Sequence, residues 1–206
     1  LAAGYLLCRP ALKNTFVYDD MRTVVRPEFI ENAQAGREAF SPSAGQAFAV
    51  GDYYAPLAAM TYAWDVRRGW NPAAMMLDAR PAHATNMALY LAVCLLAFGL
   101  FCRITGSASL AGFAAFLFLA HPMHAENIHY VSSRPETLAA LVVLAAVLLA
   151  WLPADSLWAR AGRTAGVFAA TLLALWGGRA GLAAPLVFLV ADLARDPKYQ
   201  RFDLAD

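Results

Sequence analysis

Apolar residues in this chain are gathered into long uninterrupted blocks instead of recurring at the period of a strand or of an amphipathic helix. The longest block matches the roughly 20 residues that a helix needs to cross a bilayer. Only 15% of the residues are charged, whereas soluble domains average about 25%. We therefore expect an all-α, integral membrane, multi-span helical bundle. The expected membrane-spanning helices are 83–104, 107–121, 136–152, 164–178 and 181–195.

A polar, turn-rich segment at 9–81 follows a short apolar stretch, Leu1–Cys8. That stretch is too short to cross a bilayer, so we expect residues 1–206 to form a single transmembrane domain of a longer protein. Ala47–Trp64 is aromatic and half apolar, which is typical of a helix at a membrane interface. Pro56 disfavours a straight spanning helix there. The segment is expected to be a long external loop that carries interfacial helices.

Basic residues in the short loops predict the orientation, because Lys and Arg accumulate on the cytoplasmic side. If every block crosses once, six basic residues share one side, and only Arg134 and Arg179 occupy the short loops opposite. The six are Arg103, Arg160, Arg163, Arg195, Lys198 and Arg201. We expect a bacterial inner membrane protein, or an equivalent, whose 9–81 loop faces the periplasm or lumen.

The overall charge and the cysteines exclude some classes of function. A net charge of +1 provides no field that would attract nucleic acid, so we expect no nucleic-acid partner. Cys8, Cys94 and Cys102 lie in or beside apolar segments without CxxC spacing. We interpret these three as small buried hydrophobic residues.

Two adjacent carboxylates, Asp19 and Asp20, follow the first apolar stretch. A carboxylate near a membrane surface can act as a general base when partial desolvation raises its pKa. Aspartate is also a preferred helix N-cap. Local sequence leaves both interpretations open.

Imidazole, carboxylate and guanidinium groups gather between the apolar blocks. His121, His124 and Glu126 lie in one polar break, and Arg134 and Arg179 stand at helix ends. The imidazoles suit an anion or a structural interfacial cluster. The three-residue spacing of His121 and His124 does not match the His-x-x-x-His pair of a helical zinc site, so no metal is expected. The arginines are suited to grip a phosphate or simply to snorkel.

Taken in order, several motifs carry a resemblance to one family. They are Phe16-Val-Tyr-Asp-Asp20, Tyr54-Ala-Pro-Leu57, His83-Ala-Thr-Asn86, His121-Pro-Met-His-Ala-Glu126 and Ser133-Arg-Pro-Glu136. The chain resembles the membrane domain of the GT-C glycosyltransferases that carry tetratricopeptide repeats, relatives of protein O-mannosyltransferases. The resemblance covers nearly the whole chain, and its most specific portion is the His-Pro-x-His-x-Glu and Arg-x-Glu segment.

The resemblance implies a GT-C-like fold and an inverting transfer of a sugar from a polyprenyl-phosphate carrier to an acceptor hydroxyl on the external face. It implies Asp19 or Asp20 as the catalytic base. It assigns the lipid phosphate and substrate to the polar groups near the bilayer surface, which are His121, His124, Glu126, Arg134 and Arg179. The implied partners are membrane lipids and the lipid-linked sugar, and no cofactor is expected.

This sequence departs from the family pattern where Ala55, Tyr90 and Ala180 stand at positions that carry polar groups in the family. These departures keep a second hypothesis open, in which the chain is a catalytically silent membrane subunit that acts as a scaffold in a larger assembly. A transporter is a weaker third hypothesis, because intramembrane charges often mark transport paths. The charges here gather at one surface, which disfavours it.

Overall fold

The structure is a computed structural model that describes residues 2–34, 49–50, 53–153 and 156–195. The fold is nearly all α-helical, which confirms the prediction made from the apolar blocks. The sheet content within the described residues is limited to two-residue strands.

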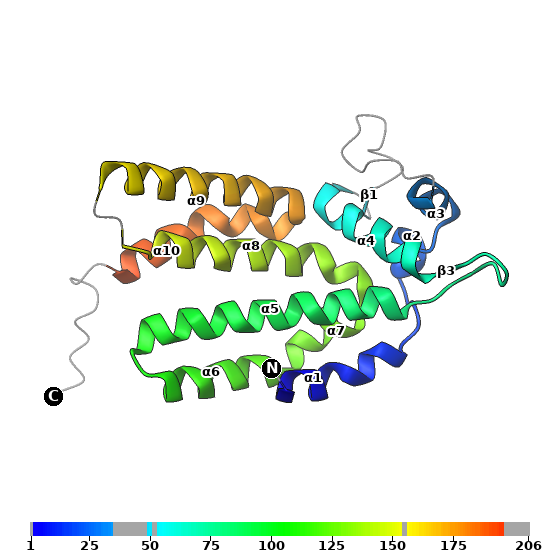
Figure 1. Cartoon of the computed structure of the whole chain (residues 1–206), viewed down its shortest axis with the longest axis horizontal. Helices are drawn as coiled ribbons and strands as arrows, with labels where there is room; N and C mark the ends of the chain where they lie inside the picture. Colours follow the sequence, from blue (N-terminus) through cyan, green and yellow to red (C-terminus); the bar gives the residue numbers. More distant parts are fainter. Residues whose placement is uncertain (1, 35–48, 51–52, 154–155, 196–206) are drawn as a thin grey trace.

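The long helices run roughly side by side along the longest axis of the molecule, and we call them the helical shaft (Figure 1). Their bounds are α5 (Arg80–Thr105), α6 (Ala108–Ala120), α8 (Arg134–Ala150), α9 (Leu157–Gly177) and α10 (Ala184–Arg195). Local chemistry sets several of these ends. Gly106 ends α5 with a left-handed φ of 64°, and the hydroxyls of Ser107 and Ser156 cap α6 and α9.

Two helical segments are long and apolar enough to cross a membrane, Arg80–Thr105 and Val131–Ala150. A third span results if Ala108–Ala120 and Pro122–His129, which bend by 55° at their junction, are counted together. α9 and α10 are helical but do not meet the same test among the described residues, because α9 carries two arginines near its start and α10 has only 12 residues. A bilayer crossing by all the predicted blocks stays a prediction.

The segment predicted as an external loop folds into short elements, most of which gather at one end of the shaft (Figure 1). They follow α1 (Ala2–Cys8) and are η1 (Arg9–Lys13), α2 (Asp20–Thr23), α3 (Pro27–Gln34), α4 (Pro56–Gly69) and the strands β1 (Ala49–Val50), β2 (Tyr53–Tyr54), β3 (Trp70–Asn71) and β4 (Met76–Leu77). β1 pairs antiparallel with β2, and β3 with β4.

Short elements between the long helices complete this fold. They are η3 (Pro122–His124), α7 (Ala125–His129), η4 (Val131–Ser133) and η5 (Arg179–Ala183). We call the region formed by α2, α3, α4, α7 and η4, with the first turns of α5 and α8, the polar end.

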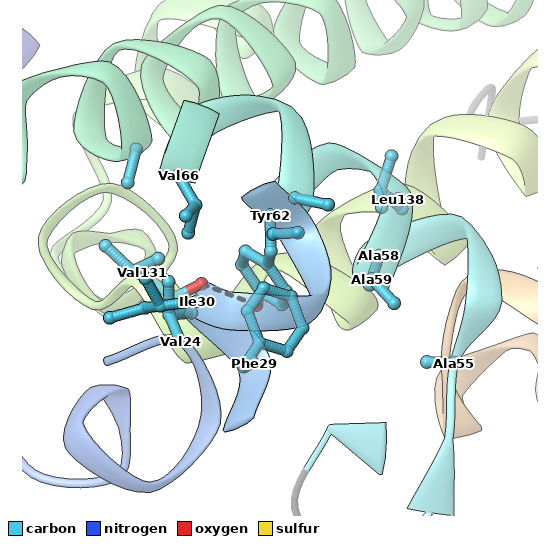
Figure 2. Close-up of a cluster of buried hydrophobic side chains, with 13 residues drawn as sticks. Val24, Phe29, Ile30, Ala55, Ala58, Ala59, Tyr62, Val66, Val131 and Leu138 are labelled. Atoms are coloured by element: carbon cyan, nitrogen blue, oxygen red, sulfur yellow. Dashed lines mark hydrogen bonds between the residues drawn. The ribbon is translucent and has the colours of Figure 1, made fainter. Parts of the chain in front are cut away.

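An apolar cluster fixes α2, α3 and α4 to the start of α8 (Figure 2). The Tyr62 ring packs edge-on against Phe29 at 6.4 Å, and its hydroxyl donates to the Val131 carbonyl at 2.8 Å. The Ala47–Trp64 stretch was predicted to be an interfacial helix, but α4 starts only at Pro56 and buries its small side chains against α3 and α5. The reason is that Ala58, Ala59 and their helical neighbours allow close packing. Residues 47–48 and 51–52 lie outside the described residues.

Candidate functional site

The adjacent carboxylates meet the polar turn before α8, although more than 100 residues separate them along the chain. Asp20 Oδ1 accepts from the Ser132 backbone N–H at 2.8 Å and from the Ser132 hydroxyl at 2.6 Å. Asp19 Oδ2 accepts from the Tyr130 hydroxyl at 2.9 Å. The structure therefore brings Asp19 and Asp20 to the turn that ends in Arg134.

The two carboxylates have different surroundings. Asp20 is fully buried, and its second oxygen accepts from the Val17 N–H at 3.1 Å. Three donors from two segments thus hold it, which is how a protein stabilises a buried carboxylate. Thr23 joins the same group through Ser132 Oγ at 2.8 Å. Asp20 therefore fastens α2 to η4 and has no access to solvent.

Asp19 is exposed, and its carboxylate accepts a hydrogen bond from the Tyr130 hydroxyl. Burial, together with the hydrogen bond to Asp19, raises the pKa of Tyr130 to about 12. The phenol therefore stays protonated at physiological pH and donates to the carboxylate. The bond to Tyr130 uses one carboxylate oxygen of the exposed Asp19, which suits a base that must reach a substrate proton with the other.

Arg134, at the start of α8, is fully buried inside the protein. Its Nε donates to Asn86 Oδ1 at 2.6 Å, and Nη2 donates to the Ala82 carbonyl at 2.9 Å. Nη1 donates to Thr61 Oγ1 at 3.1 Å and pairs with the Asp65 carboxylate at 2.7 Å. Because α4 and α5 supply these acceptors, the guanidinium joins three helices.

This network changes the interpretation of Arg134. The sequence motif suggested a group that binds lipid phosphate, but most of the N–H donors of the guanidinium are occupied by protein acceptors and no face is exposed. The cation also lies 4.4 Å from the centre of the Tyr62 ring. In this conformation Arg134 is a structural cation.

Asp65 is the anion that makes burial of Arg134 tolerable, and Thr85 donates to it at 2.7 Å. Burial raises the pKa of Asp65, and the neighbouring Arg134 guanidinium opposes that rise. A charge pair of this kind costs desolvation, but removal of either partner leaves an unpaired charge in the interior.

The histidine turn lies at the junction of α6 and α7. His121 is exposed and its Nδ1 accepts from the Met123 N–H at 3.2 Å. The His124 ring packs 4.3 Å from Phe118 and 5.6 Å from Tyr90. Glu126 is exposed on α7, and its backbone carbonyl accepts from the Ser133 hydroxyl at 3.2 Å. Ser133 follows Ser132, which binds Asp20, so the hydrogen bond of Ser133 links the histidine turn to the segment that holds Asp20.

Arg179 lies exposed on η5, which packs against α8. The approach is close: a Cβ added to Gly178 would meet the Pro135 carbonyl carbon at 2.7 Å. Only glycine fits this contact, and it brings the turn with Arg179 beside the first turn of α8. A phosphate-binding role for His121, His124, Glu126 or Arg179 stays a prediction.

Sequence reasoning missed the partners that organise the site, namely Tyr130, Ser132, Asp65, Thr61 and Asn86. One signal for Asp65 was available, because this carboxylate follows an apolar, aromatic stretch and lies three residues before Arg68. A carboxylate there predicts a charged partner. Nothing local identified that partner as Arg134, which is 69 residues away.

Among the described residues, no group of three or more His, Cys, Asp or Glu side chains is placed to hold a metal ion.

No protein-family model, curated protein or solved structure matches this chain.

Proposed function

We propose that this chain is the membrane domain of a GT-C-like inverting glycosyltransferase, a multi-span integral bundle whose polar end faces the periplasm or lumen. The donor would be a sugar on a polyprenyl phosphate, and the acceptor a hydroxyl group at the external membrane face. One observation carries this proposal: Asp19 is an exposed carboxylate that accepts a hydrogen bond from the protonated Tyr130. It lies where α2 meets the turn before α8, beside a helical segment that is apolar enough to span a membrane.

Asp19 is the proposed base, and Asp20 has a positioning role. The acceptor oxygen attacks the anomeric carbon and gives its proton to Asp19, while the bond between that carbon and the phosphate oxygen breaks. The polyprenyl phosphate then leaves with the bonding electron pair. His121, His124, Glu126 and Arg179 are the proposed contacts of donor phosphate and substrate; the first three lie at the turn between α6 and α7, and Arg179 lies on η5, which packs against α8. Arg134 has a structural role in this proposal, because it is buried and joins α8 to α4 and α5.

A second candidate function is a catalytically silent scaffold subunit. Ala55 is fully buried, and the Tyr90 hydroxyl donates to the Leu119 carbonyl at 2.9 Å. At both positions the family carries polar groups that this chain replaces with packing or with a bond inside the bundle. These two residues favour the scaffold, in which the polar end would dock other subunits of a membrane assembly.

The test separates the two carboxylates. The full-length protein is reconstituted in proteoliposomes with polyprenyl-phosphate sugars, and transfer is measured for wild type, Asp19→Asn and Asp20→Asn. We expect Asp19→Asn to lower the rate by about 10²–10⁴ with an unchanged unfolding temperature, since it removes only a base. Asp20→Asn should lower the unfolding free energy by about 1.5–3 kcal/mol, because the amide keeps one acceptor oxygen and its NH₂ cannot accept from the second backbone N–H.

Three outcomes decide between the candidates. Transfer that survives Asp19→Asn excludes Asp19 as the base. An unchanged unfolding free energy in Asp20→Asn removes the structural role given to that residue. A folded wild-type protein that transfers none of several lipid-linked sugars favours the scaffold.

A further inference from the structure

A pocket of about 530 Å³ lies between the loop after η1, the β3–β4 hairpin and the first turn of α5. Its lining does not include Asp19, Asp20 or Tyr130, and the hairpin that forms one wall projects from the polar end (Figure 1). The pocket has an apolar side, which includes Phe16 and Leu77. Its polar lining consists of Lys13, Asn14, Thr15, Asn71, Asp78 and Arg80.

The pocket carries an excess of positive charge. Lys13 and Arg80 are exposed, and neither forms an ion pair within the part of the chain that the structure describes. Asp78 is the one acidic side chain in the lining, and its Oδ1 accepts from the Arg80 backbone N–H at 3.0 Å. The carboxylate is therefore bound to the first backbone N–H of α5, so two cations face one anion that is already hydrogen-bonded.

The remaining polar groups offer mainly donors. Asn71 Oδ1 accepts from the backbone N–H groups of Ala73 and Ala74, at 3.1 and 3.2 Å, which leaves the amide NH₂ for a ligand. Asn14 Nδ2 lies 2.7 Å from His129 Nδ1, and this contact fixes the opposite wall. A set of fixed donors with an excess of cations selects an oxyanion.

The walls are held in place by close packing. A Cβ on Gly69 would lie 2.5 Å from the Asp78 carbonyl oxygen, so the two ends of the hairpin approach each other directly. The pairing of Trp70 with Leu77 continues this contact. The pocket is therefore built by backbone geometry and its cations extend from a fixed frame.

We propose that this pocket binds a phosphate-bearing molecule, whose oxyanion contacts Lys13 and Arg80 and whose remaining atoms lie against Phe16 and Leu77. The volume falls within the range of about 300–1,000 Å³ that is typical of small-ligand sites. It exceeds the size of a bare phosphate, so the ligand is a phosphate ester. A membrane lipid headgroup and a soluble phosphate ester share this chemistry.

The test measures binding alone and does not depend on the proposed transfer reaction. Inorganic phosphate is titrated into the detergent-solubilised full-length protein, and binding is followed by ³¹P NMR. We expect Lys13→Gln and Arg80→Gln each to weaken binding by about tenfold, since each removes a charged donor. Arg9→Gln is the matched control, because Arg9 is an exposed cation beside the pocket that does not line it.

A second arm identifies the source of the phosphate. The protein is placed in nanodiscs of phosphatidylcholine that contain about one third phosphatidylglycerol, and the retained lipids are counted by native mass spectrometry. Enrichment of phosphatidylglycerol that is lost in Arg80→Gln indicates a lipid headgroup. Phosphate binding without such enrichment indicates a soluble ester. The proposal is overturned if wild type shows neither, or if Arg9→Gln weakens binding as much as Arg80→Gln does.

Discussion

The polar end and the helical shaft use their side chains in opposite ways. At the polar end, charged groups are buried: Arg134, Asp65 and Asp20 lie inside the protein and each has specific partners. On the shaft, large apolar groups such as Phe113 and Phe168 are exposed. An ordinary soluble protein shows neither pattern on this scale.

The difference supports the proposal that lipid surrounds the shaft and water surrounds the polar end. Exposed Phe and Leu side chains on α6 and α9 are stable when hydrocarbon surrounds them, and contiguous apolar surface is otherwise rare. The polar end, which we also call the cap, needs partners for its buried charges, because protein surrounds those charges on all sides. The comparison therefore predicts where a membrane boundary lies, between the shaft and the cap.

The largest expected effect concerns sidedness, and it is all or none. Met21, on α2 of the polar end, is 54% exposed, and Leu157 is 77% exposed at the start of α9, beyond α8. Met21→Cys should react with a membrane-impermeant maleimide from the periplasmic or lumenal side. Leu157→Cys should react only after the membrane is permeabilised. Mass spectrometry of the labelled protein measures both.

The background for this experiment is a variant in which Cys8, Cys94 and Cys102 are replaced by serine or alanine, so that only the introduced thiol reacts. Leu157 is chosen in place of the adjacent Ser156 because the Ser156 hydroxyl caps α9. Labelling of both thiols from one side would refute the orientation drawn from the basic residues. It would also remove the boundary between cap and shaft.

The next effect tests the buried charges of the polar end. Arg134→Ala leaves Asp65 buried without its partner, which typically costs about 3–5 kcal/mol. The unfolding free energy in detergent should fall by this amount. Arg22→Ala, at an exposed arginine on α2, should change it by less than about 0.5 kcal/mol. A small effect of Arg134→Ala would mean that the guanidinium is available for a ligand, as the motif alone suggested.

The fold was largely predictable from the sequence, because hydropathy and turn residues act locally. The 83–104 block became α5, extended to Arg80 because Pro81 suits the first turn of a helix and Asp78 accepts a hydrogen bond from the Arg80 N–H. The place where α6 ends at His121 followed from the polar break. The cap was less predictable, since its short helices are stabilised mainly by tertiary packing and not by their own periodicity.

The site was predictable in part. The resemblance implied Asp19 or Asp20 as a base near the histidine turn and Arg134, and a shared site stays a prediction; the hydrogen bonds to Tyr130 and Ser132 do bring both aspartates to the turn before Arg134. The division of labour between the two aspartates depends on burial, which adjacent identical residues cannot reveal in sequence. The structural role of Arg134 depends on Asp65, and a contact across 69 residues leaves no local pattern.

The smallest effect compares two exposed apolar residues, one from each region. Phe113, in the middle of α6, is 61% exposed. Met76, in strand β4 of the hairpin that projects from the polar end, is 66% exposed. If exposure alone determined the cost, lysine at either position would change stability by less than about 0.5 kcal/mol, as on most protein surfaces. A lysine near the centre of a spanning helix instead costs about 2.5–3.5 kcal/mol.

We therefore expect Phe113→Lys to reduce membrane integration, measured as the fraction of protein that alkaline carbonate extracts from membranes, and Met76→Lys to leave that fraction unchanged. Phe113→Leu keeps the position apolar and should behave as wild type, which separates the effect of charge from the loss of the ring. Equal extraction of Phe113→Lys and Met76→Lys would mean that water or a polar partner covers α6. The exposed apolar side chains of the shaft would then mark a protein interface, and the solvent difference between the two regions would disappear.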